Sequence, residues 1–199
     1  MPESAEGRLN MEFLQTPRLV LRQMTLDDAA DLHRFMGNLR VMYAWEYAFT
    51  EEQVKEWIER NMDRYARDGA GYFLAVRRED GVCVGQAALM RGEMAGRPVW
   101  ELGWIFDETY WGKGYATEAA RALARHAFDV LGIPDLWADI RPENVRSSAV
   151  ARRIGMQPTG ESFVKHVAGK EMVHDVYRLT PDSFLAGDSA EGNIEEHHE

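Results

Sequence analysis

Apolar side chains recur along the chain in short runs. In several of these runs apolar residues alternate with other residues, as they do in half-buried β-strands. The run from Val99 to Phe106 is the clearest, because its even positions are all large and apolar. The Asp80-Gly81 and Ala168-Gly169 pairs predict hairpin turns, whereas Arg91 to Pro98 is predicted to be a loop. Strands are therefore expected at residues 18–24, 72–77, 82–89, 99–106, 136–140, 161–167 and 171–179.

The spacing of apolar residues changes after Phe106. From Ala116 to Leu131, apolar residues recur at spacings of three and four, which predicts a helix with one buried face. Gly132 caps the C-terminal end of this helix, and Pro134 prevents the helix from continuing. Residues 99–131 therefore form a strand, a turn and a helix in succession.

Three further helices are predicted from capping residues. Thr25 and Thr50 each precede an acidic or amide residue by three positions, a capping-box spacing, and these helices end near Gly37 and Gly69. Asn144 is placed to cap a helix from Val145 to about residue 154. The expected fold class is α+β, or mixed α/β, with helices on both faces of a sheet.

The organisation along the chain is that of one domain. The 199 residues can bury one core, and no composition shift suggests a second. Residues 1–15 are expected to be a flexible N-terminal lead, residues 16–180 the domain, and residues 181–199 an acidic mobile tail. Between residues 38 and 49 lies an irregular aromatic segment.

Composition narrows the possible functions. No apolar run is long enough to span a membrane and the first residues lack a signal peptide, which predicts a cytoplasmic protein. A net charge of -10 argues against nucleic-acid binding and would favour a cationic substrate. The one cysteine, Cys83, lies in an apolar run and is expected to be a packing residue. No cluster has the spacing of metal ligands, so no metal is expected.

The turn between Trp111 and Glu118 carries the main chemical signal. Gly112 and Gly114 precede the first helical turn, where unpaired N–H groups and the positive end of the helix dipole bind anions. Taken alone, the pattern fits a phosphate-binding loop and a plain tight turn equally well. A dinucleotide-binding loop would need a further glycine at position 117, where Thr117 stands.

The turn resembles the pyrophosphate loop of the GCN5-related N-acetyltransferases (GNAT). Gly114 and Ala116 match its last two small residues, while Trp111 stands where the family usually has Gln or Arg. Three features resemble the RimJ/RimL-like ribosomal-protein alanine N-acetyltransferase branch. They are the departure at Trp111, the sequence Tyr-Trp-Gly-Lys-Gly-Tyr-Ala-Thr-Glu-Ala, and Asn144 followed by Ser147 and Ser148. The resemblance extends from about residue 16 to residue 179.

This resemblance implies a fold, a cofactor and a binding site. The fold would be a mostly antiparallel, twisted sheet of six to seven strands with about four helices, in which the fourth and fifth strands (residues 99–106 and 136–140) splay apart as a wedge. Gly103 would allow the pantetheine arm of acetyl-CoA to approach, and residues 38–49 would help to wall the acceptor site. The implied binding residues are Trp104, Ile105, Phe106, Trp111, Gly112, Lys113, Gly114, Tyr115, Ala116, Thr117, Asn144 and Ser147. Lys113, Arg146, Arg152 and Arg153 add positive charge near the phosphate end.

Acetyl transfer from a thioester to an amine requires a base, donors for an oxyanion and an acid for the thiolate. Glu101 is the first candidate base and Glu161 the second, with Asp107 a weaker third; each has a plain structural role as its alternative. Backbone N–H groups near Ile105 would serve the oxyanion. Ser147 is the candidate acid, with a structural role in the first helical turn as its alternative.

Tyr110 and Tyr115 are alternative acids, and Asn144 has two expected roles, as a helix cap and as a cofactor contact.

The expected function is acetyl-CoA-dependent N-acetylation of a primary amine by direct attack. The favoured acceptor is the α-amine of a protein or peptide N-terminus, and the alternative is a small-molecule amine such as a polyamine, an antibiotic or an amino-acid derivative. A non-catalytic acyl-CoA-binding module is a rival from another class. The family resemblance suggests a monomer or a homodimer.

Overall fold

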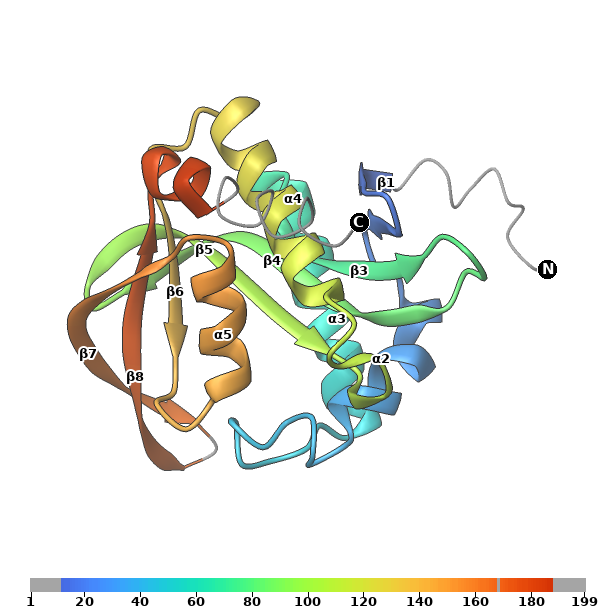
Figure 1. Cartoon of the computed structure of the whole chain (residues 1–199). Coiled ribbons are helices and arrows are strands. Elements are labelled where there is room, and N and C mark those ends of the chain that lie inside the picture. Colours follow the sequence, from blue (N-terminus) through green and yellow to red (C-terminus); the bar gives the residue numbers. More distant parts are fainter. Residues whose placement is uncertain (1–11, 168, 188–199) are drawn as a thin grey trace.

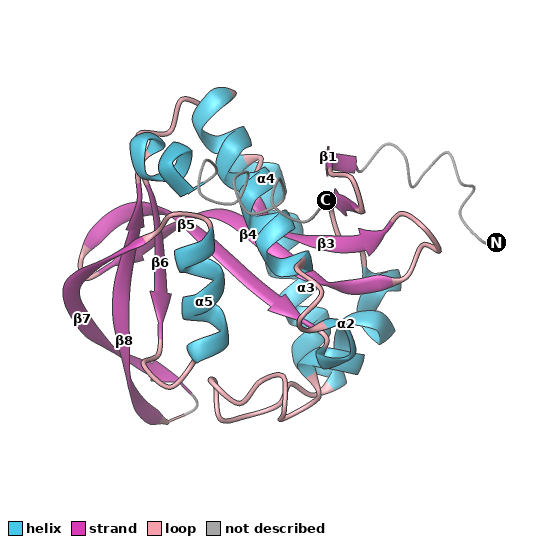
Figure 2. Cartoon of the chain, in the orientation of Figure 1, coloured by secondary structure: helices cyan, strands magenta, loops and turns pink. Residues whose placement is uncertain are grey.

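The computed structural model describes residues 12–167 and 169–187, so Ala168 and most of the predicted lead and tail lie outside the described residues. A single eight-stranded sheet runs through the molecule in the order β1-β2-β3-β4-β5-β6-β8-β7 (Figures 1 and 2). Its strands are β1 (Glu12–Gln15), β2 (Leu19–Arg22), β3 (Gly71–Arg77), β4 (Cys83–Met94), β5 (Arg97–Phe106), β6 (Leu136–Ile140), β7 (Gln157–Val167) and β8 (Lys170–Leu179). All neighbouring strands are antiparallel except β5 and β6.

Helices cover both faces of this sheet. In Figure 1, α4 (Tyr115–Asp129) and α5 (Val145–Arg153) lie in front of the sheet, and α2 (Ala29–Met36) and α3 (Glu51–Asp68) lie behind it. Helix α4 packs on β4 and β5, and α3 packs on β3 and β4. The α3 side is called the rear face below. Thr50 and Gln53 form the predicted capping box of α3, and Gly69 ends that helix with a φ of 67°.

A wedge opens in the sheet between its two parallel strands. Strands β5 and β6 are paired at one register position, Glu101 opposite Trp137, whereas β4 pairs with β5 along its whole length. From residue 102 to residue 106, the β6-facing edge of β5 therefore has no strand partner among the described residues. The mixed fold with this splayed pair is confirmed, and the sheet has one strand more than the largest predicted number.

Three boundaries predicted from the sequence were wrong. Strand β1 lies within the predicted flexible lead, where Phe13 stacks on Phe73 at a ring distance of 4.0 Å. The predicted loop at residues 91–98 is instead the end of a long hairpin, which turns at Ala95 and Gly96 with φ values of 50° and 76°. Residues 181–187 are helical and Phe184 is buried, so the folded domain continues past residue 180.

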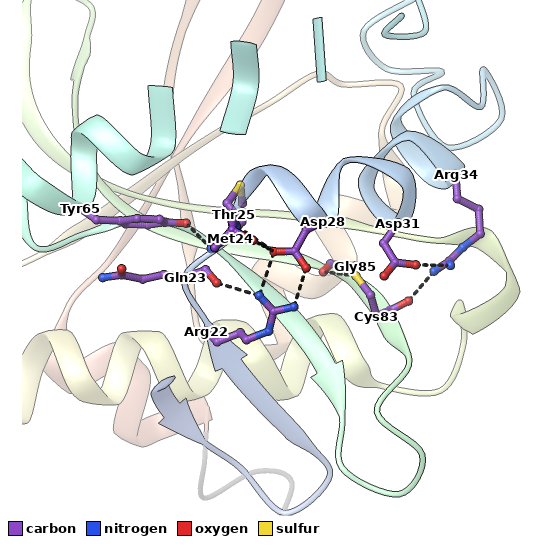
Figure 3. A network of polar contacts seen from close by, with 10 residues as sticks. All are labelled: Arg22, Gln23, Met24, Thr25, Asp28, Asp31, Arg34, Tyr65, Cys83 and Gly85. Carbon is purple, nitrogen blue, oxygen red and sulfur yellow. Dashed lines mark hydrogen bonds and ion pairs between the residues drawn. The ribbon is translucent and has the colours of Figure 1, made fainter. Parts of the chain in front are cut away.

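A polar network joins the start of α2 to the sheet (Figure 3). The Arg22 guanidinium donates two hydrogen bonds to the Asp28 carboxylate, at 2.9 and 2.6 Å. The same carboxylate accepts from the Thr25 backbone N–H at 2.8 Å, which completes the predicted helix start. Arg34 at the other end of α2 donates to the Cys83 carbonyl and to Asp31. This network fixes α2 against β2 and β4.

Replacing Asp28 with alanine should lower the free energy of unfolding by about 3 kcal/mol, because the nearly buried Arg22 cation loses its partner. The matched control is Glu56→Ala, which removes an exposed helical ion pair with Arg60 and should cost about 0.5 kcal/mol or less. Urea unfolding monitored by circular dichroism measures both. Equal losses in the two variants would contradict this account of the network.

Candidate active site

The connection from β5 to α4 is shaped by one tryptophan and two glycines. The Trp111 indole Nε1 donates to the Phe106 carbonyl at 2.8 Å, which folds the connection back onto the end of β5. Gly112 and Gly114 have φ values of 75° and 78°, in the left-handed region that favours glycine. The chain then enters α4 at Tyr115.

Backbone N–H groups from Gly112 to Thr117 have no hydrogen-bond acceptor among the described residues. A Cβ built on Gly112 would meet no atom within 4 Å, so the space beside this turn is open. The Lys113 carbonyl, by contrast, is occupied, because the Arg18 guanidinium donates to it at 2.9 Å. The turn thus presents unpaired donors at a positive helix end, as an anion-binding loop does.

A long cleft of about 1420 Å³ extends from this turn across the α4 side of the sheet and is called the front cleft. Its lining carries five arginines and two carboxylates in a chain whose net charge is -10. One of these carboxylates, Glu118, is neutralised by Arg18 at 2.6 Å and also accepts from Thr16. Arg146 lies over the Trp111 ring at 4.3 Å. The cleft is therefore suited to a polyanionic ligand.

The structure brings most of the predicted binding residues to the front cleft. Lys113 is an exception, because it does not line the cleft and its Nζ lies over the Tyr110 ring at 5.2 Å. Arg152 also lies outside the cleft lining. The predicted residues that line the cleft are Trp104, Ile105, Phe106, Trp111, Gly112, Gly114, Tyr115, Ala116, Thr117, Asn144, Ser147, Arg146 and Arg153.

Asn144 combines a helix cap with a contact that reaches across the cleft. Its Oδ1 accepts from the Ser147 backbone N–H at 3.1 Å and from the Tyr43 hydroxyl at 2.6 Å. The Ser147 hydroxyl has no partner among the described residues and lines the cleft. The capping role of Asn144 is therefore present, and the Ser147 hydroxyl remains available.

A second cavity of about 310 Å³ lies on the rear face and is called the rear pocket. Strand register places Glu101, Asp139 and Tyr72 on this face, opposite α4. The front cleft and the rear pocket have six lining residues in common, which lie around the wedge and in the loop before α3. These residues are Ala44, Trp45, Trp104, Ile105, Asn144 and Ser147. The two cavities thus meet where β5 and β6 separate.

Glu101 is a buried carboxylate in the rear pocket. Burial, together with the nearby charge of Asp139, raises the pKa of the Glu101 carboxyl to about 7. Gly92 makes room for this carboxyl, because a Cβ on Gly92 would lie 2.0 Å from Glu101 Oε1. A carboxyl with a pKa near 7 is suited to general-base work at neutral pH.

The other two candidate bases do not reach either cavity. Glu161 is half exposed on β7 and forms an ion pair with Arg97. Asp107 is buried, accepts from the Thr109 backbone N–H, and pairs with Arg34 at 3.0 Å. Burial opposes the charged form of Asp107, but these donors hold the pKa of its carboxyl below the usual range. Both residues have structural contacts in place of the predicted catalytic ones.

Packing contacts also fix the two alternative acids, Tyr110 and Tyr115, and the one cysteine, Cys83. Tyr115 is buried with the Arg18 guanidinium 4.6 Å from its ring centre, and Tyr110 lies between Lys113 and Arg77. Cys83 is buried, and burial raises the pKa of its thiol to about 12. The prediction that Cys83 is a packing residue is confirmed.

Sequence reasoning missed several residues that line the cavities. Arg121 and Arg125 follow Thr117 at four-residue steps along α4, a helical spacing that could have revealed them. Asp139 and His174 carried no local signal, because distant segments bring them to the site.

The described residues contain neither a membrane-spanning helix nor a metal-binding cluster. No helix in that part of the chain is both long and apolar enough to cross a membrane. Over the same residues, no group of three His, Cys, Asp or Glu side chains is arranged to hold a metal ion.

Comparison with known proteins identifies relatives of this arrangement. Residues 18–157 match the family model described as an acetyltransferase (GNAT) domain. A curated relative, the uncharacterized N-acetyltransferase YnaD of Bacillus subtilis, is 30% identical over 148 residues, which cover 74% of this chain and 84% of YnaD.

Solved structures agree with that match. The GNAT-family acetyltransferase of Bacillus anthracis superposes with a TM-score of 0.73 at 27% identity, covering 85% of this chain and 99% of the other. A Vibrio cholerae protein, provisionally named a ribosomal-protein-serine acetyltransferase, superposes with a TM-score of 0.71 at 25% identity, covering 84% of this chain and 96% of its own.

Proposed function

The chain belongs to the GNAT acetyltransferase family, and from this premise we propose that it transfers acetyl from acetyl-CoA directly to the α-amine of a protein or peptide N-terminus. Membership makes the protein an N-acetyltransferase that uses acetyl-CoA and acts on an amine. The observation that supports direct transfer is the meeting of two cavities from opposite faces of the sheet at the wedge. One cavity has unpaired N–H donors and arginines, and the other has a buried carboxylate.

The front cleft fits coenzyme A in both its charge and its backbone. The N–H groups of Gly112 to Thr117 would hold the diphosphate, since they have no acceptor of their own among the described residues. The unpaired edge of β5 would pair with the pantetheine arm. The Asn144 side-chain amide nitrogen is available to donate, since only its oxygen has partners among the described residues. When bound, acetyl-CoA supplies an activated thioester.

Glu101 would act as the general base in this mechanism. Its carboxylate, directly or through a water, removes one proton from the acceptor nitrogen as the bond from nitrogen to the acetyl carbon forms. An α-amine has a pKa near 8, so a base with a pKa of about 7 is strong enough. The rear position of Glu101 separates the base from the phosphate-binding cleft.

Ser147 would act as the general acid at the junction of the two cavities. Its hydroxyl donates a hydrogen bond to the sulfur as the carbon–sulfur bond breaks and passes on a proton from water, so the sulfur leaves as a thiol and the serine stays neutral. A thiolate leaving group needs no strong acid. Backbone N–H groups on the unpaired edge of β5 are available to the negatively charged oxygen that develops.

The branch assignment supports the choice of acceptor. We place the chain with the RimJ/RimL-like proteins because Trp111 replaces the usual Gln or Arg and because Asn144 is followed by Ser147 and Ser148, a pattern that resembles that branch. The likeness to the Vibrio cholerae structure at 25% identity points the same way. A cytoplasmic location is part of this proposal, since ribosomal proteins are made there.

A small-molecule amine is the second candidate acceptor. The rear pocket favours it through its small volume of about 310 Å³ and its two carboxylates, Glu101 and Asp139. A pocket of that size would admit one residue of a peptide or one whole small amine.

Thiol release from acetyl-CoA tests the function and separates the two acceptors. The enzyme is offered N-terminal peptides of ribosomal proteins, the same peptides with blocked N-termini, and a polyamine. Release with free peptides only supports the first proposal. Release with the polyamine only would transfer the assignment to the second candidate, and release with neither would overturn both.

Replacing Ser147 with alanine should lower kcat about 10²-fold while the Kd for CoA changes less than about twofold, because the hydroxyl acts on the leaving sulfur. The neighbouring Ser148 donates to the Val145 carbonyl and lines neither cavity, so Ser148→Ala is the matched control. Steady-state kinetics and calorimetry give the two constants. Unchanged turnover in Ser147→Ala would make the residue structural only.

A further inference from the structure

An aspartate–histidine pair forms part of the rear pocket and has no role in the mechanism above. Asp139 lies on β6 opposite Val176 of β8, so His174, two residues from Val176, is on the same face. His174 Nδ1 lies 2.5 Å from Asp139 Oδ2, and the two side chains are 14% and 10% exposed. Lys165 Nζ also reaches the Asp139 carboxylate, at 2.7 Å. The pair is built into the sheet and both members line the pocket.

This contact decides which imidazole nitrogen is available to a ligand. The Asp139 carboxylate lies at ion-pair distance from Nδ1 and favours a proton there, so neutral His174 has an unprotonated Nε2 that can accept a hydrogen bond. Burial opposes the charged form of Asp139, but His174 and Lys165 hold the pKa of its carboxyl below the usual range, so the carboxylate beside Nδ1 stays ionised at neutral pH. The tautomer of His174 follows from its neighbour.

Both ring nitrogens of His174 are buried without a well-aligned hydrogen bond among the described residues. Nδ1 has the Asp139 carboxylate at ion-pair distance, whereas Nε2 has no partner among these residues. Buried polar atoms nearly always have a hydrogen-bond partner, because an unmet one destabilises the fold. Glu101 lies on the same face, since it is opposite Trp137, two residues from Asp139. The pocket therefore offers a base on β5 and an unused hydrogen-bond acceptor on β8.

We propose that His174 Nε2 accepts a hydrogen bond from a second N–H or O–H group of the acceptor substrate, so that the enzyme selects amines that carry such a group. This inference depends on the proposed acetyl transfer to an amine at Glu101. A peptide N-terminus supplies the second donor from its first peptide N–H, and a polyamine supplies it from another nitrogen. A simple monoamine or an amino-acid ester has none.

Paired acceptors that differ by one donor measure this selection. Alaninamide and alanine methyl ester form one pair, and 1,4-diaminobutane and butylamine form the other, so a response in one pair identifies the source of the donor. In the wild-type enzyme, the acceptor with the donor should have a KM at least about fivefold lower in at least one pair. In His174→Phe, which keeps a ring and removes Nε2, that ratio should fall below about twofold.

The matched control is His166→Phe. His166 lies on the same hairpin, is exposed, contacts Glu171 at 3.2 Å and lines neither cavity. This variant should keep the wild-type KM ratio. The Kd for CoA, measured by calorimetry, should be unchanged in both variants, which shows that the fold is intact.

Nitrogen NMR of the CoA-bound enzyme tests His174 without turnover. The His174 signals should show a protonated Nδ1 and an unprotonated Nε2, and the Nε2 signal should move with alaninamide or diaminobutane but not with the partner lacking the donor. A wild-type KM ratio near one, a ratio kept in His174→Phe, or an unmoved Nε2 signal would overturn this inference. Absence of thiol release with every amine would instead contradict the proposed function, and the NMR titration would still decide the role of His174.

Discussion

Replacing Gly114 with valine should weaken CoA binding at least about 100-fold. The residue has a φ of 78°, which costs a side-chain-bearing residue about 1–2 kcal/mol and more for a β-branched one. A Cβ here also lies 3.4 Å from Arg18 Nη2, beside the N–H groups proposed to hold the diphosphate. Relief of this backbone strain would rotate those N–H groups away from the cleft. Calorimetric titration with CoA measures the loss.

Gly81→Val separates this effect from strain alone. Gly81 has a φ of 73° in the hairpin turn between β3 and β4, and a Cβ there meets no atom within 4 Å. It lines neither cavity. The two variants should lose similar stability, but Gly81→Val should bind CoA normally. Normal affinity in Gly114→Val would remove the proposed phosphate-binding role of the turn.

Replacing Glu101 with glutamine should lower kcat/KM for the acceptor about 10²- to 10⁴-fold, because an amide cannot accept the proton. In the wild type, activity should fall as the pH drops below about 7, since the Glu101 carboxyl then becomes protonated. Glu101→Gln should lose the part of this acidic limb that comes from the carboxyl and keep the part that comes from protonation of the acceptor amine, whose pKa is near 8. A pH series of thiol-release rates measures both effects.

Unfolding gives a second readout of the same carboxyl. Its pKa is raised in the folded state, so the folded protein holds the proton more tightly and the stability from this group is lost as the pH rises from about 4.5 through about 7. That loss should disappear in Glu101→Gln. Glu161→Gln is the control, since it changes an exposed carboxylate outside both cavities and should leave rate and pH profile unchanged. A wild-type pH profile in Glu101→Gln would exclude Glu101 as the base.

Features set by neighbouring residues could be predicted from the sequence. The ends of α3 follow from a capping box at Thr50 and a left-handed glycine at position 69, both of which act within one helical turn. The glycine turn before α4 was found for the same reason, because its φ values and free N–H groups are local properties. The cleft around that turn was therefore largely anticipated.

The hairpin at residues 91–98 shows where local patterns fail. Gly92 and Gly96 suggested a loop, but Gly92 lies in strand β4. It is a glycine there because the Glu101 carboxyl occupies the space that a side chain would need. Met94 and Val99 are buried in a cluster with Val176 of β8, far along the chain, against which Trp137 and Phe163 also pack. Neither reason can be read from residues 91–98 alone.

Long-range contacts also decide what the site residues do. Glu101 and Glu161 were similar as sequence candidates, yet one is buried in the rear pocket and the other is paired with Arg97 at the surface. Asp139 and His174 meet only because β6 pairs with β8. The sequence could therefore supply the residue types of the site, whereas the fold decides which of them act together.

Amide NMR during titration with CoA tests the central claim most directly, because it observes the nitrogens from Gly112 to Thr117 themselves. Pantetheine, which lacks the diphosphate, is the matched ligand. The amide signals of this turn should move with CoA and remain in place with pantetheine, whereas signals near the wedge should move with both. Signals from Gly112 to Thr117 that stay in place at saturating CoA would contradict the account.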